Sequence, residues 1–394
     1  MPIPNSTASG RTDAGQAPAN EGGEIAAIER IRAALPGAPP GQVWIGDDSA
    51  VLPGIRSQML LATDLTVAGV HADLDLVGLD DMGWKAVAVT VSDVAAMGGR
   101  PREVLVAVAG PPDTDLDLLY DGIGLGAARH GCAVVGGDLS DAGQLVVCVA
   151  VTGFVPKAVL RSGATPGDFL FVTGPLGASA AGLRLLRQAA PQGHGRAGAI
   201  GGTDAGAGAI ADADADADAG AGAIADADAD ADAGADAGAD AGAIAVHGVP
   251  GTTGSTSRAG STDDVITRRL IEAHRRPVAR LAEGEAARLA GCRAMIDVSD
   301  GLALDIHRLA DASGVGFRLD QVPVASGALA DEALAGGEDY ELIMAVADPA
   351  RLVARFTGSG LAEPVLIGVC VEDPTERTLA GEPLAPRGWE HTWS

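Results

Sequence analysis

Hydrophobic and polar positions follow two different periods along the chain, which predicts a mixture of helices and strands. Apolar residues recur every three or four positions over the expected helices, at residues 24–34, 80–97, 116–130, 179–188, 263–290 with a break at Pro277, and 301–311. Short apolar runs predict strands at residues 43–45, 59–62, 104–109, 133–135, 145–155, 169–172, 294–297, 315–319, 342–347 and 365–371. Such an order favours layered α/β or α+β domains over a helical bundle or a β-sandwich.

The segment Ala294–Gly301 shows an order of residues that recurs through the chain. Its apolar residues lead into Asp297 and Asp300, and a helical pattern follows. Asp297 is therefore predicted to end a strand, with Ser299 or Asp300 capping the helix. Four earlier segments repeat the order of apolar residues before an acidic residue, and they end at Asp48, Asp64, Asp93 and Asp138. Five such strand ends predict carboxylates at one sheet edge, and oxygen ligands of this kind select Mg²⁺ or Mn²⁺ over zinc.

Length and charge narrow the class of protein. The 394 residues allow two or three domains, and the net charge of -26 argues against nucleic acid or an anionic membrane surface as a partner. No apolar run approaches the roughly 20 residues that span a bilayer. The polar start of the chain lacks the apolar segment of a secretion signal. The four cysteines are widely spaced, which predicts reduced thiols in a cytoplasmic protein without a membrane partner.

The segment from about residue 195 to 260 is dominated by Ala-Asp dipeptides. One block of it starts at Ala207 and again at Ala221. A stacked repeat needs an apolar face, and one isoleucine per period does not provide it. The segment is therefore predicted to be a disordered surface insertion without chemistry. A weak calcium-binding repeat is the alternative, although the glycine pattern of such repeats is absent.

Three common catalytic motifs give no assignment. Gly-x-x-x-x-Gly-Lys-Ser/Thr is absent, which excludes a P-loop site. Residues 122–127 match the glycine pattern of dinucleotide-binding folds, but no strand precedes them, so the match is interpreted as accidental. A serine hydrolase would need a Gly-x-Ser-x-Gly turn, which the chain lacks. The aspartates remain as the candidate chemistry, and several carboxylates around divalent ions suit a polyphosphate substrate.

Six motifs stand in a fixed order, at residues 46–52, 63–71, 85–98, 136–138, 296–302 and 336–342. Together they resemble the thiamine-monophosphate kinases, of the aminoimidazole-ribonucleotide-synthetase (AIR-synthase)-like superfamily. The last motif, Gly-Gly-Glu-Asp-Tyr-Glu-Leu, is the most specific of the six. The resemblance covers residues 23–188 and 263–391, which is everything except the start of the chain and the insertion.

The resemblance implies a two-domain AIR-synthase-like fold of α/β (α+β) class. After a disordered leader at residues 1–22, an N-terminal domain at residues 23–150 would form a dimeric β-barrel with a second copy. A C-terminal α/β domain would occupy residues 151–394, interrupted by the insertion at about 195–260. The implied activity is phosphorylation of thiamine monophosphate by ATP, with several Mg²⁺ ions, in a homodimer.

The resemblance also implies a role for individual residues. The Mg²⁺ ligands would be Asp48, Thr63, Asp64, Asp93, Asp138, Asp297 and Asp300. The ATP contacts would be Tyr120, Gly137, Arg161 and Ser299. The thiamine side would be held by His71, Glu338 and Trp389. Because the attacking phosphate oxygen is already ionised at neutral pH, no catalytic group separate from the metal cluster is expected.

Two alternatives stay open at this stage. The first is another ATP-using enzyme of the superfamily; selenophosphate synthetase would need a reactive cysteine near the start of the chain, whereas the first cysteine here is Cys132. The second is a non-catalytic nucleotide-binding scaffold. It is kept because Leu139-Ser140-Asp141 replaces the Thr-Thr-Arg that is common in the family after Gly-Gly-Asp, so an acid stands where a phosphate-facing arginine is usual.

Overall fold

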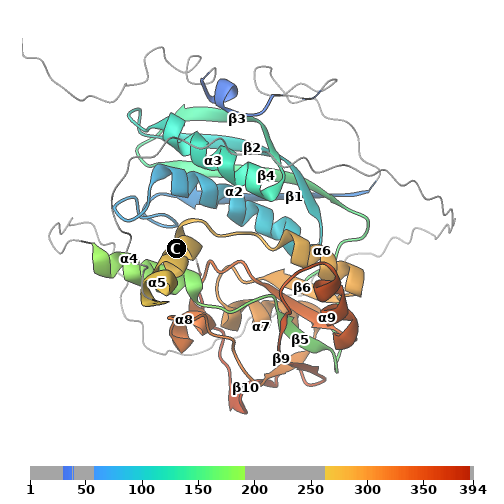
Figure 1. Cartoon of the computed structure of the whole chain (residues 1–394). Coiled ribbons are helices and arrows are strands. Elements are labelled where there is room, and N and C mark those ends of the chain that lie inside the picture. Colours follow the sequence, from blue (N-terminus) through green and yellow to red (C-terminus); the bar gives the residue numbers. More distant parts are fainter. Residues whose placement is uncertain (1–29, 38, 40–56, 191–261, 391–394) are drawn as a thin grey trace, which may run out of the picture. The chain divides into compact units, whose positions relative to one another are not determined.

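The computed structural model describes residues 30–37, 39, 57–190 and 262–390. They form two β-sheets with their helices (Figure 1). The predicted leader, the strand expected at residues 43–45, Asp48 and the Ala-Asp insertion lie outside the described residues. Of the helix predicted at residues 24–34, the described part is helical from residue 30 to residue 34.

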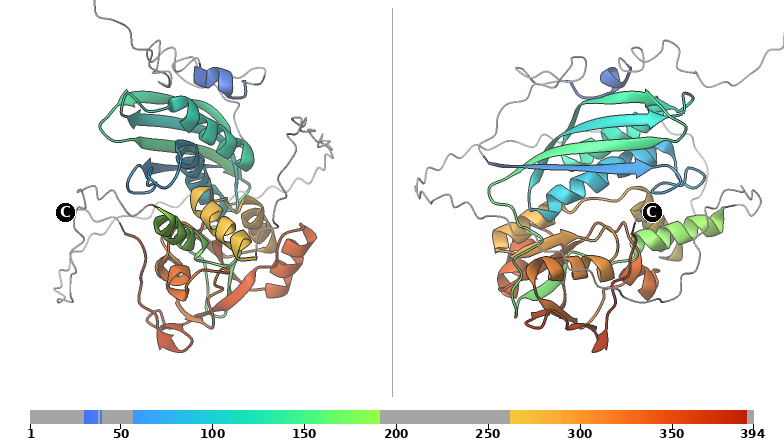
Figure 2. Two further views of the ribbon diagram at one scale, coloured as in Figure 1. Left: turned by 60° about the vertical axis from the view of Figure 1, so that its left-hand side comes forward. Right: turned by 180° about the vertical axis from the view of Figure 1, so that it is seen from behind.

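The first sheet has four strands in the order β1-β4-β2-β3. Its strands are β1 (Gln58–Val67), β2 (Arg100–Gly110), β3 (Ala133–Asp141) and β4 (Val146–Val155). β2 and β3 are parallel, and the other pairs are antiparallel. Helices α2 (Leu79–Ala96) and α3 (Leu116–His130) cover one face. The other face carries no described helix (Figure 2).

The second sheet has seven strands in the order β11-β10-β7-β9-β5-β8-β6. They are β5 (Phe169–Val172), β6 (Ala294–Asp297), β7 (Gly316–Leu319), β8 (Leu342–Val346), β9 (Val365–Val371), β10 (Arg377–Leu379) and β11 (Glu382–Pro383). Only β10 and β7 pair in parallel. The helices of this half are α4 (Ala178–Ala189), α5 (Thr262–Arg275), α6 (Leu281–Ala290), α7 (Leu302–Ser313), α8 (Ala330–Ala335) and α9 (Pro349–Gly358).

The sequence predicts most of these elements and misses the shortest ones. α8, β10 and β11 span six, three and two residues, too few for a hydrophobic period to appear. The expected domain boundary at residues 150 and 151 falls inside β4, because that strand stays paired with β1 as far as Val155. Among the described residues the first sheet is open, with β1 and β3 as its edges, so this part of one chain does not close the barrel expected for the N-terminal domain.

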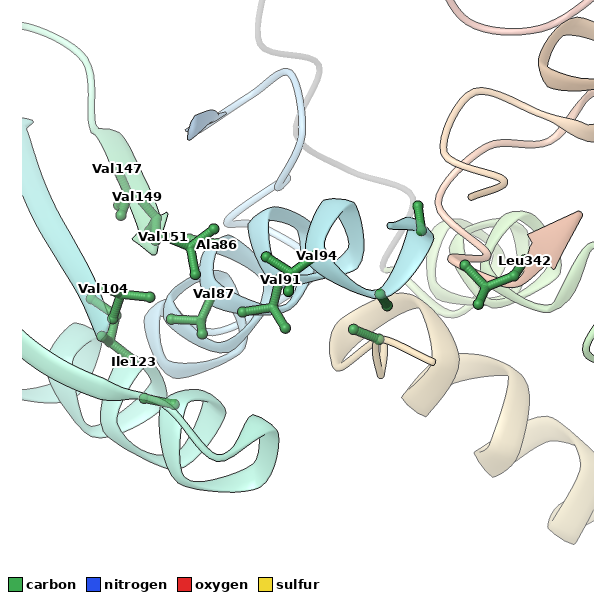
Figure 3. Close-up of a cluster of buried hydrophobic side chains, with 14 of the residues drawn as sticks. Ala86, Val87, Val91, Val94, Val104, Ile123, Val147, Val149, Val151 and Leu342 are labelled. Carbon is green, nitrogen blue, oxygen red and sulfur yellow. The ribbon is translucent and has the colours of Figure 1, made fainter. Parts of the chain in front are cut away.

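Helix α2 packs on both halves of the structure. Its apolar residues, among them Val87 and Val91, face strands of the first sheet and Ile123 of α3 (Figure 3). Toward its C-terminal end, Val94 approaches the second half, where Leu342 joins the same core. α2 also contacts β6 and α6. A helix buried on several sides carries few polar positions, and this explains its nearly continuous apolar sequence.

Glycines bring α3 close to α2. A Cβ atom on Gly122 would lie 1.9 Å from the backbone oxygen of Asp80, and one on Gly126 would lie 3.2 Å from that of Trp84. The glycine pattern at residues 122–127 therefore serves helix packing, inside a helix that follows no strand directly. The interpretation of this motif as accidental with respect to dinucleotides is consistent with that position.

Within the described ranges, no helix is both long and apolar enough to cross a bilayer. All four cysteines are unpaired thiols, and Cys292 and Cys370 are buried.

Replacing Gly122 by alanine should lower the free energy of unfolding by about 2–3 kcal/mol, because the added methyl group meets rigid backbone. Gly124 is the matched control on the same helix, since its Cβ would meet only the side-chain end of Leu35, at 3.2 Å. Gly124→Ala should be neutral or slightly stabilising through helix propensity. Urea unfolding followed by circular dichroism measures both, and equal effects would contradict the packing role of Gly122.

Candidate functional site

Three aspartates from three elements form the centre of the site. Asp297 is the last residue of β6 and is 6% exposed. Its Oδ2 accepts a hydrogen bond of 2.6 Å from Ser92 Oγ of α2. The next residue of α2, Asp93, and Asp64 of β1 are close enough to Asp297 for its charge to raise the pKa of both carboxyl groups. The site therefore joins both halves of the fold.

Burial and mutual repulsion disfavour the ionised forms of these aspartates. Burial, followed by the charges of Asp297 and Asp64, raises the pKa of Asp93 to about 7, and Arg161 offsets part of this. Burial also raises the pKa of Asp64, with Asp297 and Asp300 adding to it. The pKa of Asp297 rises through burial, against the hydrogen bond from Ser92. A bound cation would strongly stabilise the ionised form of these three carboxyl groups.

A cavity of about 310 Å³ opens beside this cluster. Asp93, Asp297 and Arg161 supply its polar lining. Apolar residues of β1, of α2 with the Met97 that follows it, and of β6 line the rest: Leu60, Leu61, Ala62, Val94, Ala96, Met97, Met295 and Ile296. Leu61 takes part through its backbone, since its side chain points to the other face of the sheet. A pocket that is apolar with a few convergent charges is typical of a small-molecule site.

Asp300 lies in the turn between β6 and α7. Its carboxylate accepts a hydrogen bond from Arg308, which also pairs with Asp305 at 2.8 Å. The prediction that Ser299 or Asp300 caps α7 is wrong, because the N-cap is Gly301 and has no side chain. Instead the buried Asp305 accepts hydrogen bonds from the backbone N–H groups of Asp300 and Gly301. Asp305 thereby fixes the turn that presents Asp300.

The prediction that the aspartates all follow strand ends is correct only for Asp297 among the described ones. Asp64 lies within β1, because that strand stays paired with β4 as far as Val67. Asp93 lies within α2, whose apolar run at residues 89–91 looks like a strand because the helix is buried. Asp138 lies within β3, which pairs with β2 up to residue 141.

Tyr120, Gly137 and Asp138 form a second group, near the β3 edge. Burial raises the pKa of the Tyr120 hydroxyl, and the charge of Asp138 adds to it. In register across the sheet, Asp64 is level with Gly137, with β4 and β2 in between. Three strand spacings amount to about 14 Å. One chain therefore does not bring Asp138 to the carboxylates of Asp64 and Asp297.

Thr63 is also turned away from the first cluster. Neighbouring residues of a strand point to opposite faces, and Thr63 is exposed whereas Asp64 is partly buried. The Thr63 hydroxyl donates to the backbone oxygen of Val149 at 3.0 Å, on the uncovered face of the sheet. The side chain of Thr63 is therefore not among the groups that the structure brings together.

Two of the three residues expected to hold the thiamine side, Glu338 and Trp389, contact the turn of Asp300 through their backbones. The backbone N–H of Trp389 donates to the Asp300 oxygen at 3.0 Å, and that of Glu338 donates to the Ser299 oxygen at 2.7 Å. The Trp389 side chain is 53% exposed. Lys85 connects Glu338 to His71, with hydrogen bonds of 2.7 Å to Glu338 Oε2 and 3.0 Å to the His71 oxygen.

The loop that carries Glu338 is held on several sides. Glu338 and Tyr340 have left-handed backbone angles, with φ of 66° and 52°, a conformation that costs non-glycine residues energy. Asp339 accepts hydrogen bonds from the N–H groups of Gly177 and Ser179 at the start of α4. Glu341 accepts hydrogen bonds from Arg280 and Thr173. These contacts maintain the strained loop.

Within the described ranges, no three His, Cys, Asp or Glu side chains are grouped closely enough to hold a metal ion as they stand. The chemistry of the donor set nevertheless fits a hard divalent cation. Asp64, Asp93 and Asp297 offer only oxygen, are partly or fully buried, and repel one another. Asp48, a further ligand expected from the sequence, lies outside the described residues.

Sequence reasoning gave no role to three polar residues of the site. Lys85 stands between the apolar residues Trp84 and Ala86 of α2, and a lone polar residue in such a run is a signal that could have identified it. Ser92 is followed directly by Asp93, so its position gives a weaker signal. His274 of α5 lies 3.5 Å from Glu338 Oε2. Its partner is distant in sequence, so no local pattern indicates the contact.

Known proteins resemble both halves of the chain. Residues 46–155 match the AIR synthase related protein N-terminal domain, and residues 242–380 match the AIR synthase related protein C-terminal domain. The thiamine-monophosphate kinase of Bacillus subtilis (strain 168) is 30% identical over 338 residues, which cover 82% of this chain and 83% of that protein.

Two solved structures share the fold. The crystal structure of thiamine-monophosphate kinase from Stenotrophomonas maltophilia K279a aligns with a TM-score of 0.65 and 27% identity, over 92% of this chain and 98% of that one. A structure described as AaThiL complexed with AMPPCP and TMP aligns with a TM-score of 0.61 and 25% identity, over 96% of this chain and 100% of that one. The resemblance found in the sequence motifs is confirmed.

Asp93→Asn should stabilise the metal-free protein at high pH. The pKa of Asp93 is raised from 3.8 to about 7, so the folded state holds this proton more tightly than the unfolded state. Its contribution to stability is therefore lost as the pH rises from about 4 through 7. In chelator at pH 8, the variant should gain about 1–2 kcal/mol in free energy of unfolding, after allowance for partial exposure.

At pH 5 the gain from Asp93→Asn should fall to less than half of its value at pH 8, because the carboxyl of the folded wild type is then protonated whereas that of the unfolded chain is already ionised. Urea unfolding at both pH values measures the difference. Asp113→Asn, at an exposed position before α3, is the matched control. Its effect on the free energy of unfolding should be the same at pH 5 and pH 8. A gain from Asp93→Asn of the same size at pH 5 and pH 8 would contradict the repulsion argument.

Proposed function

Because the chain belongs to the thiamine-monophosphate kinase family, we propose that it transfers the γ-phosphate of ATP to thiamine monophosphate, giving thiamine diphosphate and ADP. The observation that carries this proposal is the meeting of Asp64, Asp93 and Asp297 from both halves of the fold, beside the turn that holds Glu338 and Trp389. The complex of AaThiL with AMPPCP and TMP supports the same pair of substrates.

The reaction asks the protein for alignment and charge compensation. The nucleophile is an oxygen of the thiamine monophosphate phosphate, which attacks the γ-phosphorus in line while the bond to the β-phosphate oxygen of ATP breaks. That oxygen is ionised at neutral pH, so no proton has to be removed. The phosphate of the acceptor and the triphosphate of ATP are both anions and must approach each other, and a positively charged environment lowers this repulsion.

The buried carboxylates would hold Mg²⁺ ions. Asp64, Asp93, Asp297 and Asp300 are the described residues proposed as ligands, together with Asp48. Mg²⁺ bound there would neutralise phosphate oxygens during transfer. Arg161, which lines the cavity next to Asp93 and Asp297, would add a fixed positive charge toward ATP. Asp305 and Ser92 would keep the ligands oriented through their hydrogen bonds to the Asp300 turn and to Asp297.

The remaining expected contacts divide between the two substrates. Ser299, Tyr120 and Gly137 are proposed to contact ATP. Asp138 lies too far from Asp64 to share an ion with it, so it is proposed to hold a separate ion at the β3 edge. The Thr63 hydroxyl faces the uncovered side of the sheet and is not proposed as a ligand. His71, Glu338 and Trp389 are proposed to hold the ring system of thiamine monophosphate. The exposed indole of Trp389 suits a cationic thiazolium, and the Glu338 carboxylate suits an amino group.

A homodimer is proposed through the uncovered face of the first sheet. This face exposes four large apolar side chains from β1 and β2: Met59, Leu61, Leu65 and Leu105, which are 57%, 68%, 56% and 46% exposed. A second copy of the chain would bury them and could close the two open sheets into a barrel. Contiguous apolar residues on a sheet face are typical of such an interface.

Release of ADP tests the proposed function most directly. With Mg²⁺ and ATP, the purified chain should release ADP when thiamine monophosphate is supplied, and not with thiamine or without an acceptor. Asp297→Asn should lower this turnover about a hundredfold or more, because the centre of the ligand set is lost. Zn²⁺ should not replace Mg²⁺. Equal ADP release with and without thiamine monophosphate would contradict the function.

Trp389→Ala should raise the KM for thiamine monophosphate roughly tenfold, which corresponds to about 1–2 kcal/mol of lost stacking on the cationic ring. The KM for ATP should change little, since Trp389 is not expected to contact the nucleotide. Trp389→Phe keeps an aromatic face and should lose less. Steady-state kinetics with each substrate varied in turn decides it, and equal increases for both substrates would speak against this role.

Leu61→Glu should convert the dimer to a monomer, because it places a charge in the apolar face. Leu125→Glu is the matched control, since Leu125 is 54% exposed but lies on α3, away from the uncovered face. Sedimentation velocity measures both. A wild-type monomer, or a Leu61→Glu dimer, would contradict the proposed interface.

A further inference from the structure

Lys85 is a buried cation in an apolar helix. The residue is 3% exposed, and its neighbours on α2 include the fully buried Met82 and Ala86. Its ammonium group donates to Glu338 Oε2 at 2.7 Å and to the backbone oxygen of His71 at 3.0 Å. These partners lie 14 residues before it and 253 residues after it in the sequence. One side chain thus ties together two of the residues proposed to hold the acceptor.

The charge that faces Glu338 comes from Lys85. His274 also lies near, with Nδ1 3.5 Å from Glu338 Oε2 and 3.1 Å from Ser179 Oγ. Burial, followed by the charge of Lys85, lowers the pKa of His274 to about 4. The imidazole is therefore neutral near pH 7 and contributes no ionic partner. The buried ammonium of Lys85 is therefore balanced by the carboxylate of Glu338, and the carboxylate by the ammonium.

The two oxygens of Glu338 have different surroundings. Oε2 is enclosed by Lys85 and His274, whereas Oε1 makes no hydrogen bond within the described part of the chain. The side chain keeps 25% of its surface exposed. A carboxylate held at Oε2 by Lys85 presents Oε1 as an acceptor oxygen, and the same contact restricts the directions in which Oε1 can point.

We propose that Lys85 is a positioning residue that keeps the Glu338 carboxylate turned toward the acceptor substrate, so that the site selects a heteroaromatic ring bearing an amino group. This inference rests on the proposed function. An ionised carboxylate only accepts hydrogen bonds, and therefore favours an amino group over a carbonyl oxygen at the same ring position. Lys85 itself does not touch the substrate; it acts through Glu338 and through the backbone of His71.

Removing the ammonium should abolish this selection. Without the hydrogen bond that Lys85 gives to Oε2, the Glu338 side chain can rotate away from the ring. A carboxylate that is no longer held against the amino position does not repel a carbonyl oxygen there, so the site tolerates either group. The predicted signature is a loss of discrimination between two acceptors, which a general weakening of the fold would not produce.

The experiment compares thiamine monophosphate with oxythiamine monophosphate, in which a carbonyl oxygen replaces the amino group of the pyrimidine. The wild-type enzyme should prefer thiamine monophosphate by about a hundredfold in kcat/KM. Lys85→Met should raise the KM for thiamine monophosphate about tenfold to a hundredfold and reduce the preference to within a few fold. The KM for ATP should stay within about twofold.

Arg184→Met is the matched control. Arg184 also joins an ion pair, to Glu332 at 2.6 Å, with a hydrogen bond of 3.0 Å to the backbone oxygen of Gly327. It lies on α4, outside the proposed site, so its loss should leave the preference between the two acceptors unchanged. Melting temperatures of both variants show how much stability each ion pair contributes.

Glu338→Gln keeps the test decisive if Lys85→Met does not fold. This variant retains Lys85 but can donate from its amide, so it too should lose the preference. The double variant should lose no more than either single one. The inference is overturned if the wild type accepts both substrates equally, if Lys85→Met keeps the preference, or if Glu338→Gln keeps it. Absence of any transfer to thiamine monophosphate by the wild type would instead overturn the proposed function.

Discussion

The burial of α2 between the two halves of the chain is the constraint on which the rest depends. Its apolar residues complete the core of the first sheet and also meet Leu342 and β6 of the second half. Because the helix is enclosed, each polar group on it requires a partner from elsewhere. Ser92 donates a hydrogen bond to Asp297, and Lys85 donates one to Glu338. The contacts that assemble the site are therefore the same ones that satisfy the polar groups of a buried helix.

The carboxylate cluster opposes this stabilisation. Asp64, Asp93 and Asp297 lie where burial and mutual charge raise their pKa values, so the free chain holds them at an energetic cost. Nearby positive and hydroxyl groups, Arg161 and Ser92, compensate for part of that cost. The apolar core of α2 supplies the stability that permits it. Sites that bind cations commonly show this conflict between function and the stability of the empty protein.

The sequence predicts the helices and their ends well, because these depend on neighbouring residues. It predicts contacts between distant segments less well. Helices such as α3 and α7 show their period and their glycine stops, so their limits are found to within about two residues. Asp64, Asp93 and Asp138 were placed at strand ends because an apolar run before an acid looks the same in a strand interior or a buried helix. The contacts of Lys85, and the strand register that separates Asp64 from Asp138, depend on segments far apart in the sequence. The spacing of residues along the sequence does not indicate them. The family could nevertheless be identified, because six motifs occur in the same order as in its members.

The ties across the two sheets also bear on how substrates enter. Ser92–Asp297 and Lys85–Glu338 cross from α2 to the second half, and Arg276 of the stretch after α5 pairs with Asp80 and Asp81 at the start of the same helix. A hinge opening between the halves would have to break these contacts together, and Ser92–Asp297 is buried from water. The two sheets are therefore expected to keep their relative orientation while substrates enter and leave.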